Sequence, residues 1–146
     1  MEPVKWNWSV GEDEFLLRIG EIDALDDLTP LGALDLRYRL LQGHERGGFE
    51  HAPVRGREIR DCLRLGLIGA GMDRREAERK AREGYEYTDI AALNLLAFTI
   101  LSRAFAGREH DPVGEDEAGE MKSASASPAF TEPAQPSASP QPKSET

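Results

Sequence analysis

The segment from Arg57 to Met72 constrains the fold most, because its apolar residues recur at intervals of three and four. These residues are Ile59, Cys62, Leu63, Gly66, Leu67 and Ala70. A helix places them on one face and places Arg57, Arg60 and Arg64 on the opposite face. The spacing therefore predicts that LRLGLI ends an amphipathic helix and is not a buried strand.

The run LGLIGAGM also resembles the first strand and phosphate loop of a dinucleotide-binding fold. That fingerprint needs a preceding strand, a helix that opens within it, and a third glycine where the helix packs on the sheet. Arg74 occupies the third position, and no alternating strands elsewhere could build a parallel sheet. Asp89 stands at the distance of a ribose-binding acid, but it is predicted to start another helix. We therefore predict no dinucleotide site and no other cofactor.

The glycines are predicted to form a corner between two helices. Gly69 and Gly71 end the first helix, where residues that tolerate a positive φ close the turn. Asp73 and Glu76 match a variant of the capping box that starts the next helix. Gly66 lies within the first helix and destabilises it by about 1 kcal/mol relative to alanine. A glycine at this position indicates that another part of the backbone approaches it closely.

Two short strands are predicted near the N-terminus. Residues 5–10 and 14–19 alternate apolar and polar side chains and are separated by residues 11–13, which indicates a β-hairpin. Because an isolated hairpin is only marginally stable, we expect it to pack on helices, with Trp6 and Trp8 in the core.

Two helices are predicted next. The residues with helical spacing in the first, acidic stretch are Ile22, Leu25 and Leu28. Thr29 and Pro30 then give a cap followed by proline at the first helical position, which favours a new helix. This helix carries Asp35 and Arg39 at the spacing of an ion pair and ends at Gly43. Its apolar stripe consists of Leu31, Leu34, Tyr38 and Leu41.

The irregular stretch GHERGGFEHAPVRG follows and carries His44 and His51 beside glutamates. These residues lack the ordered spacing of metal ligands, and the chain has a single cysteine, Cys62. We therefore predict no metal site. Cys62 is expected to be a buried apolar residue of a protein from a reducing compartment.

Basic residues gather in the segment 55–82, where nine basic side chains accompany five acidic ones. Its second helix is predicted from Asp73 to about Glu83, with Ala77 and Ala81 on the inner face. Two basic helical faces allow a helix-turn-helix interpretation with nucleic acid as the partner. The start of the second helix carries acids rather than base-reading Asn or Gln, which favours solvated faces and salt bridges. The arginines concerned are Arg57, Arg60, Arg64, Arg75 and Arg79.

The last helix is predicted from its cap, Thr88, to Ala106, with Gly107 closing it. It is apolar on two faces. The first face consists of Ile90, Leu93, Ala97, Ile100, Leu101 and Ala104. The second face consists of Ala91, Leu95, Phe98 and Phe105. Because few other elements are available to cover both faces, we predict that the second face binds a partner.

The chain has 146 residues and a net charge of −9, which disfavours nucleic acid and anionic membranes as partners. No signal peptide, membrane span or catalytic constellation is recognisable, so we expect a soluble, non-enzymatic protein. Residues 108–146 carry eight acidic and three basic residues and become rich in Ser, Ala and Pro. They are predicted to form a disordered tail after a domain spanning residues 1–107. The predicted fold is α+β, mostly α, with the hairpin packed on four to five short helices.

The segments REIRDCLRLGLIGAGMDRREAERKAREG and IAALNLLAFTILSRAFAG resemble the gene transfer agent family of small phage-tail proteins. The matching positions are Gly20-Glu21-Ile22, Arg64 to Met72, Glu76-Ala77 and Ala104 to Gly107. The resemblance covers roughly residues 10–107. The chain departs from the family pattern at Ala70, Tyr85 and Tyr87, in the long irregular loop and in the tail.

The resemblance implies a non-enzymatic role in assembling the tail. Members correspond to tail assembly chaperones, which cover the tape measure protein and help to recruit tail tube subunits. Both proteins, and a second copy of the chain, are thus expected partners in the host cytoplasm or on assembling tails. Two alternatives stay open. One is a structural minor component of the tail tube, which would need a large β-sheet, and the other is a nucleic-acid-binding regulator.

Overall fold

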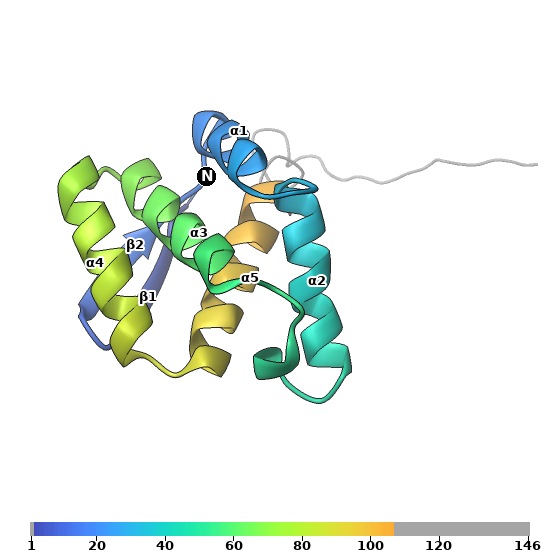
Figure 1. The fold of residues 1–146 in the computed structure, drawn as a ribbon. Helices are drawn as coiled ribbons and strands as arrows, with labels where there is room; N and C mark the ends of the chain where they lie inside the picture. Colours follow the sequence, from blue (N-terminus) through green and yellow to red (C-terminus); the bar gives the residue numbers. More distant parts are fainter. Residues whose placement is uncertain (1, 107–146) are drawn as a thin grey trace, which may run out of the picture. The chain divides into compact units, whose positions relative to one another are not determined.

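The computed structural model describes residues 2–106. They form strands β1 (Val4–Trp8) and β2 (Gly11–Phe15), helix α1 (Ile19–Leu28), helix α2 (Ala33–Glu45), a 3-10 turn η1 (Phe49–His51), and helices α3 (Gly56–Gly69), α4 (Arg74–Tyr87) and α5 (Ile90–Ala106). Figure 1 shows the N-terminal hairpin packed on the helices, which confirms the predicted fold class. The tail predicted for residues 108–146 lies outside the described residues.

The hairpin turns earlier than its sequence suggests. β1 and β2 pair antiparallel, from Val4 opposite Phe15 to Trp8 opposite Gly11, so residues 9 and 10 form the turn. The predicted turn at residues 11–13 is therefore wrong. A two-residue hairpin turn needs backbone with a positive φ at or beside it, and Gly11, at φ 117°, supplies this without the steric cost of a Cβ atom.

The second strand also ends earlier than predicted, at Phe15. Leu16 and Leu17 are both buried, so the alternation of a strand stops there. The Leu16 amide instead donates a hydrogen bond of 2.9 Å to the carbonyl oxygen of Gly66 in α3. Ile19, which the sequence placed in the strand, begins α1 and is 70% exposed.

The two tryptophans of β1 differ in burial. Trp8 is buried and packs edge-on against Phe15, with ring centroids 5.4 Å apart. Its Nε1 donates to the Asp13 carboxylate at 2.8 Å, and Lys80 of α4 donates to the same oxygen at 2.7 Å. Trp6 is half-buried at the edge of the core. The predicted core position is therefore confirmed for Trp8 and only partly for Trp6.

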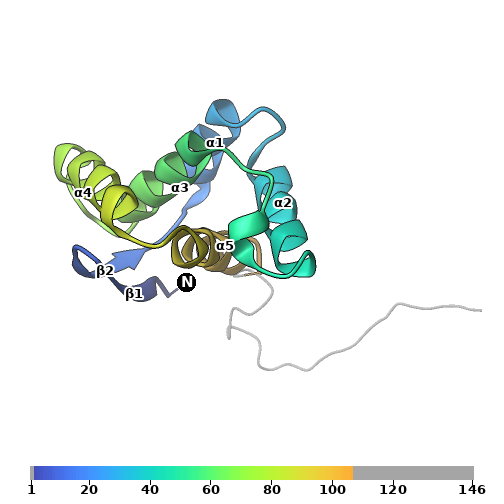
Figure 2. The same ribbon diagram turned by 60° about the horizontal axis from the view of Figure 1, so that its bottom comes forward.

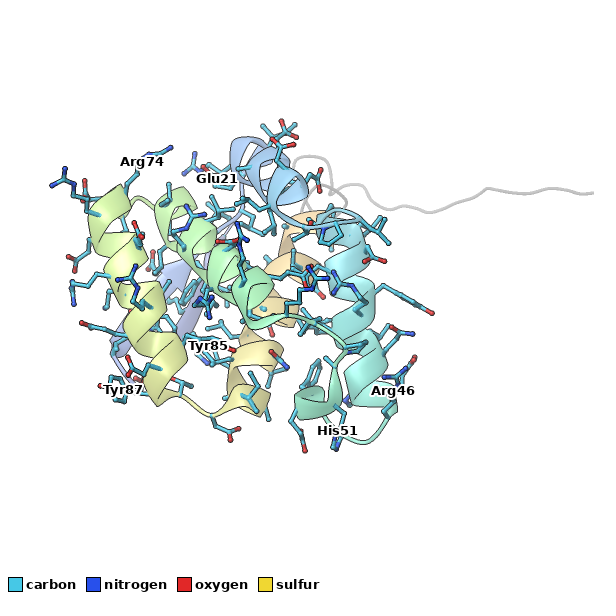
Figure 3. The ribbon with its side chains drawn as sticks, viewed as in Figure 1. Glu21, Arg46, His51, Arg74, Tyr85 and Tyr87 are labelled. Carbon is cyan, nitrogen blue, oxygen red and sulfur yellow. The ribbon has the colours of Figure 1, made fainter. Side chains whose placement is uncertain are left out.

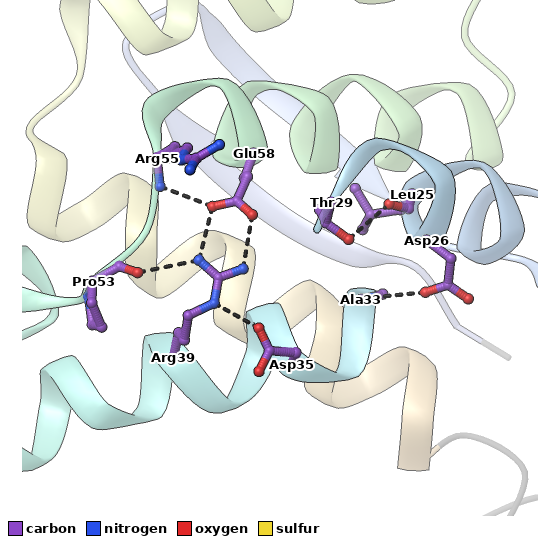
Figure 4. Close-up of polar contacts among 9 residues, drawn as sticks. All are labelled: Leu25, Asp26, Thr29, Ala33, Asp35, Arg39, Pro53, Arg55 and Glu58. Carbon is purple, nitrogen blue, oxygen red and sulfur yellow. Dashed lines mark hydrogen bonds and ion pairs between the residues drawn. The ribbon is translucent and has the colours of Figure 1, made fainter. Parts of the chain in front are cut away.

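Helix α2 begins at Ala33, and the predicted start at Thr29-Pro30 is wrong. The Thr29 hydroxyl donates to the carbonyl oxygen of Leu25 at 3.0 Å, so Thr29 ends α1. The Asp26 carboxylate accepts a hydrogen bond of 2.7 Å from the Ala33 amide, which takes over the capping role. Figure 4 shows both contacts at the junction of the two helices.

Gly43 does not end α2, which continues to Glu45. Gly43 lies inside the helix and is buried against Ala52, where a Cβ atom would lie only 2.6 Å from the Ala52 amide nitrogen. Gly47, at φ 114°, follows the helix and lets the chain reverse. The glycine that the sequence assigned to a helix end thus provides a close approach between α2 and the following loop.

Helix α3 confirms the predicted amphipathic helix over LRLGLI. Ile59, Cys62, Leu63 and Leu67 are fully buried, and Arg57 is exposed on the outer side. α4 then extends to Tyr87, beyond the predicted end near Glu83. Gly84 remains helical and buried because the Trp8 ring fills the space that a side chain there would occupy.

Asp89, one residue after the predicted cap, caps α5. Its carboxylate accepts hydrogen bonds from the amides of Ala91 and Ala92, at 3.1 and 3.3 Å. Thr88 ends α4, and its hydroxyl bonds to Ser9 in the hairpin turn. A threonine that the sequence assigned to a helix start therefore fixes the hairpin to the end of α4.

Helices α3 and α5 form the centre of the described residues. α3 contacts α1, α4, β2 and α5, whereas α5 contacts α2, η1 and β1. Figure 2 shows α5 nearly end-on, with the hairpin on one side and α2 on the other. Both central helices are thus covered on their inner faces, and the outer sides of α5 and α2 meet solvent.

Candidate interaction surfaces

The α3–α4 corner is fixed by the hairpin. The Gly66 carbonyl accepts from Leu16, and a Cβ atom at Gly66 would lie 3.2 Å from the Phe15 side chain. At Gly69 a Cβ atom would collide with the Leu16 carbonyl oxygen. Arg18 adds a hydrogen bond of 3.0 Å from Nε to the Gly69 carbonyl. The two glycines therefore let the chain after β2 lie directly against α3.

The turn into α4 uses Gly71 and Asp73. Gly71 has φ 110°, and the Asp73 carboxylate accepts from the amides of Arg75 and Glu76, at 3.1 and 3.3 Å. Glu76 does not complete a capping box, because its carboxylate accepts from Arg79 at 2.7 Å. These contacts give the corner residues a structural role in turning the chain.

A groove of about 480 Å³ lies beside this corner. It is lined by Lys5, Glu12, Asp13, Glu14, Leu67, Ala70, Gly71 and Met72. Its lining carries three carboxylates and Lys5, and one of the carboxylates, Asp13, is already paired with Lys80. The lining therefore keeps a small negative excess, which does not favour a phosphate.

Several basic side chains of α3 and α4 contact neighbouring side chains, whereas Arg57, Arg74 and Arg75 are exposed. Arg79 pairs with Glu76 and Glu83 at 2.7 and 3.0 Å, and Arg82 pairs with Glu78 at 3.2 Å. On α3, Arg64 pairs with Asp61 and Arg60 stacks over Tyr85, which Figure 3 labels on α4. These pairings lower the positive potential that nucleic-acid binding would require.

A buried ion pair joins α2 to α3 (Figure 4). Arg39 donates to Asp35 at 2.8 Å, as its spacing predicts, and also donates two hydrogen bonds of 2.9 and 2.8 Å to Glu58. Glu58 is 2% exposed and accepts a further bond from the Arg55 amide. The hydrogen bonds from Arg39 lower the pKa of Glu58 although burial opposes this, and they raise the pKa of Arg39.

Sequence reasoning missed Glu58 as a partner of Arg39. Local spacing found the pair within α2 but gave no signal for a contact across nineteen positions. The only available signal was that Glu58 precedes Ile59 at the start of the apolar face of α3. A charged residue in that position is buried only when a cation from elsewhere reaches it.

The predicted partner face of α5 lies along the outer side of the helix. Leu95 is 37% exposed, and Ala91, Phe98 and Phe105 are each partly exposed. Phe98 and Phe105 also pack against the core, so the four residues are not equally accessible. The structure thus places the four residues in one row whose most accessible member is Leu95.

An aromatic stack borders this row and was missed by sequence reasoning. His44 stacks on Phe49 with centroids 5.2 Å apart, and Phe49 contacts Phe98 at 5.4 Å. The Arg37 guanidinium lies 5.1 Å from the centre of the Phe98 ring. Asn94 of α5 donates to the Phe49 carbonyl at 2.8 Å. The irregular loop is therefore anchored to α5 beside the row.

A second apolar surface lies on α2. The α2 stripe consists of Leu34, Tyr38 and Leu41, which lie opposite the buried face of the helix, and of Leu31, which precedes the helix. Leu31, Leu34 and Tyr38 are 76%, 61% and 56% exposed, and Leu41 is half-buried. The sequence identified the stripe but did not indicate that it faces solvent, because a second set of apolar residues makes the buried face. This set consists of Ala33, Leu36 and Leu40, with Gly43.

Residues 2–106 contain no cluster of three or more His, Cys, Asp or Glu side chains that could hold a metal ion. Cys62 is fully buried, and burial raises the pKa of its thiol to about 12. The thiolate form needed for reactivity is therefore scarce at neutral pH.

A family model described as "Phage tail tube protein, GTA-gp10" matches residues 4–107. The chain belongs to this family. The match includes both strands and all five α-helices between residues 2 and 106, and it confirms the gene transfer agent resemblance. A search of curated proteins and a search of solved structures gave no match.

Membership gives the protein a structural role in tails of the phage or gene-transfer-agent type. Such a role associates it with other tail components and with tail particles. Within residues 2–106, every helix falls short of the length and apolar character needed to cross a membrane.

Proposed function

We propose that this protein is a non-enzymatic tail assembly chaperone that binds a helix of the tape measure protein through α5. The observation that carries the proposal is the outer row of α5, where Leu95 is accessible and Ala91, Phe98 and Phe105 are partly accessible. On the opposite face of α5, Leu93, Ala97, Ile100 and Leu101 are buried, whereas Ile90, at the start of the helix, is 41% exposed. A helix that is buried on one side and apolar on the other offers a surface on which a second amphipathic helix can pack.

Phe98, one member of the row, is held in place before any partner arrives. Phe98 is fixed between Phe49 and the Arg37 guanidinium, and Arg37 also donates to Ser102 at 3.0 Å. Side chains that are already ordered lose little conformational entropy on binding. This supports the use of α5 as a docking surface rather than as a helix left partly uncovered.

The physical demands of tail assembly fit such a surface. A tape measure protein is a long helical chain, and its uncovered apolar stripes would aggregate. A small protein with a net charge of −9 that covers a stripe would keep the tape measure chain in solution. In the same role it would bring tail tube subunits to the covered chain. Family membership supports this role because it places the protein among tail proteins.

Co-expression with the tape measure protein of the same particle tests the proposal. We expect Leu95→Asp to reduce co-purification by about tenfold or more, because a carboxylate would lie in the apolar contact. Leu95 is 37% exposed, so the variant should keep its helical circular dichroism spectrum. Phe98 is left unchanged because its stack with Phe49 anchors the loop.

Ile19→Asp serves as the matched control. Ile19 is an exposed apolar residue at the start of α1, and its substitution adds the same charge away from α5. We expect this variant to co-purify like the unchanged protein. Equal recovery of the Leu95→Asp and Ile19→Asp variants would contradict the proposal.

A structural component of the tail tube is the second candidate, favoured by the description of the matched family. Tube subunits that close into rings need an extended sheet, whereas residues 2–106 contain a single two-stranded sheet with five-residue strands. Quantitative mass spectrometry of purified particles separates the candidates. A copy number equal to that of the tube subunit would favour the tube role, and absence from mature particles would favour the chaperone.

A further inference from the structure

The α2 stripe is a surface that the proposed function does not use. Leu31, Leu34 and Tyr38 are each more than half exposed, and Leu41 extends the row toward the end of the helix. Leu34, Tyr38 and Leu41 follow the spacing of one helix face. Figure 1 shows α2 on the side opposite α4, with one flank not covered by the other helices and strands of residues 2–106. An apolar row of this kind on a charged domain marks an interaction site.

The charges around the stripe are asymmetric because two cations of α2 turn inward. Arg37 donates to Ser102 and covers Phe98, and Arg39 is held by Asp35 and Glu58. Neither guanidinium is therefore available to a partner on the outer face.

Acidic side chains remain exposed around the stripe. Asp26 and Asp27 lie at its N-terminal end, and Glu45 lies at its C-terminal end beside the exposed Arg46. The whole segment 19–54 contains seven acidic and three basic residues. Figure 3 labels Arg46 just beyond the end of α2.

Two arginines reduce the negative charge at the N-terminal end of the stripe. Arg55 and Arg57 line a cleft together with Asp26 and Asp27, on the side of α2 that faces α3. Residues 19–57, which include these two arginines, still carry seven acidic residues against five basic ones, and two of the five, Arg37 and Arg39, turn inward. This acidic excess complements a cationic partner and not a second copy of the same acidic face.

We propose that the α2 stripe binds an amphipathic partner helix whose apolar row is flanked by Lys or Arg. The leucines and Tyr38 pack against the apolar row, and the acidic rim attracts the flanking cations. This inference concerns a different helix from the proposed function and stands independently of the α5 surface.

A pair of synthetic helical peptides tests the inference with the full-length protein. Both carry the same leucine row, one with lysine flanks and one with glutamate flanks. We expect fluorescence anisotropy to show tighter binding of the lysine peptide, by about tenfold or more, and weakening as salt rises. Equal affinity for the two peptides would overturn the acidic-rim assignment.

Two variants locate the binding site. The double variant Leu34→Ser, Tyr38→Ser should weaken binding of the lysine peptide by about tenfold or more, because both side chains belong to the apolar contact. The double variant Asp27→Lys, Glu45→Lys should bind the glutamate peptide more tightly than the lysine peptide. Tyr87→Ser is the control, since Tyr87 is 70% exposed at the end of α4. Unchanged binding by the serine variant would show only adventitious charge attraction and would overturn the proposal.

Sedimentation of the protein without peptide distinguishes a second copy as the occupant. We expect a monomer at the concentrations used for anisotropy. A dimer that the Leu34→Ser, Tyr38→Ser variant abolishes would mean that the stripe is covered by its own copy, which would overturn the assignment of a cationic helix. None of these measurements uses a variant of α5. A negative result for the α2 stripe therefore does not affect the tape measure proposal, which has a separate test.

Discussion

Helices α2 and α5 differ in how much of their apolar surface is exposed. α5 is apolar on two faces, and the surrounding elements still cover most of it, leaving Leu95 as the accessible leucine of its outer row. α2 is far less apolar as a whole, yet Leu34 and Tyr38 point into solvent. The hydrophobicity of a helix therefore does not decide how much apolar surface it exposes. In α2 the face that turns inward is the one that carries Gly43, which approaches Ala52 closely.

The largest expected effect contrasts the two faces of α2. Leu36→Ala should lower the free energy of unfolding by about 3 kcal/mol, because Leu36 is fully buried and its truncation leaves a cavity. Leu34→Ala should change it by less than about 0.5 kcal/mol, since Leu34 is 61% exposed. Urea denaturation measures both values. Similar losses for the two variants would mean that the stripe is part of the core.

The next effect concerns the ion pair that fixes α2 against α3. Glu58→Gln should lower the free energy of unfolding by about 3 kcal/mol, because it leaves the Arg39 guanidinium without its buried carboxylate. Glu76→Gln removes a carboxylate from an exposed pair on α4 and should cost less than about 1 kcal/mol. Thermal unfolding of the two variants provides the measurement. A negligible change at Glu58 would show that packing alone orients α2.

The smallest expected effect is the pH dependence of this pair. The pKa of Glu58 is lowered in the folded protein. The contribution of Glu58 to stability is therefore complete above the usual glutamate pKa near 4.3 and is lost as pH falls through the lowered value. Urea denaturation at a series of acidic pH values, on unchanged protein and on Glu58→Gln, measures the difference. We expect the two stabilities to converge as pH falls below about 4. A constant difference across this range would contradict the assignment.

Local sequence patterns predicted much of the fold where one signal dominated. α3 has a single apolar face, and its helical period was sufficient to reject a strand. The corner at Gly69 and Gly71 and the capping residue Asp73 followed from turn chemistry. The hairpin register failed because Leu16 and Leu17 leave the strand to contact α3, which no alternation pattern reports.

The candidate surfaces were only partly predictable for the same reason. The α5 row could be read from its two apolar faces, but the anchoring of Phe98 by Phe49 and Arg37 involves segments far apart in sequence. The pairing of Arg39 with Glu58 likewise crosses between helices. Spacing rules describe neighbours within one element and are silent about contacts between elements.

The sequence by itself determined the helical class, the glycine corner and the family, because each rests on local periodicity or on a contiguous motif. Only the tertiary structure decided which face of α2 is buried. Two apolar sets compete on that helix, and Gly43 lets its face approach Ala52 closely while the bulkier stripe of Leu34 and Tyr38 remains outside. Which of the two faces packs densely against its neighbours is decided only when those neighbouring elements are present.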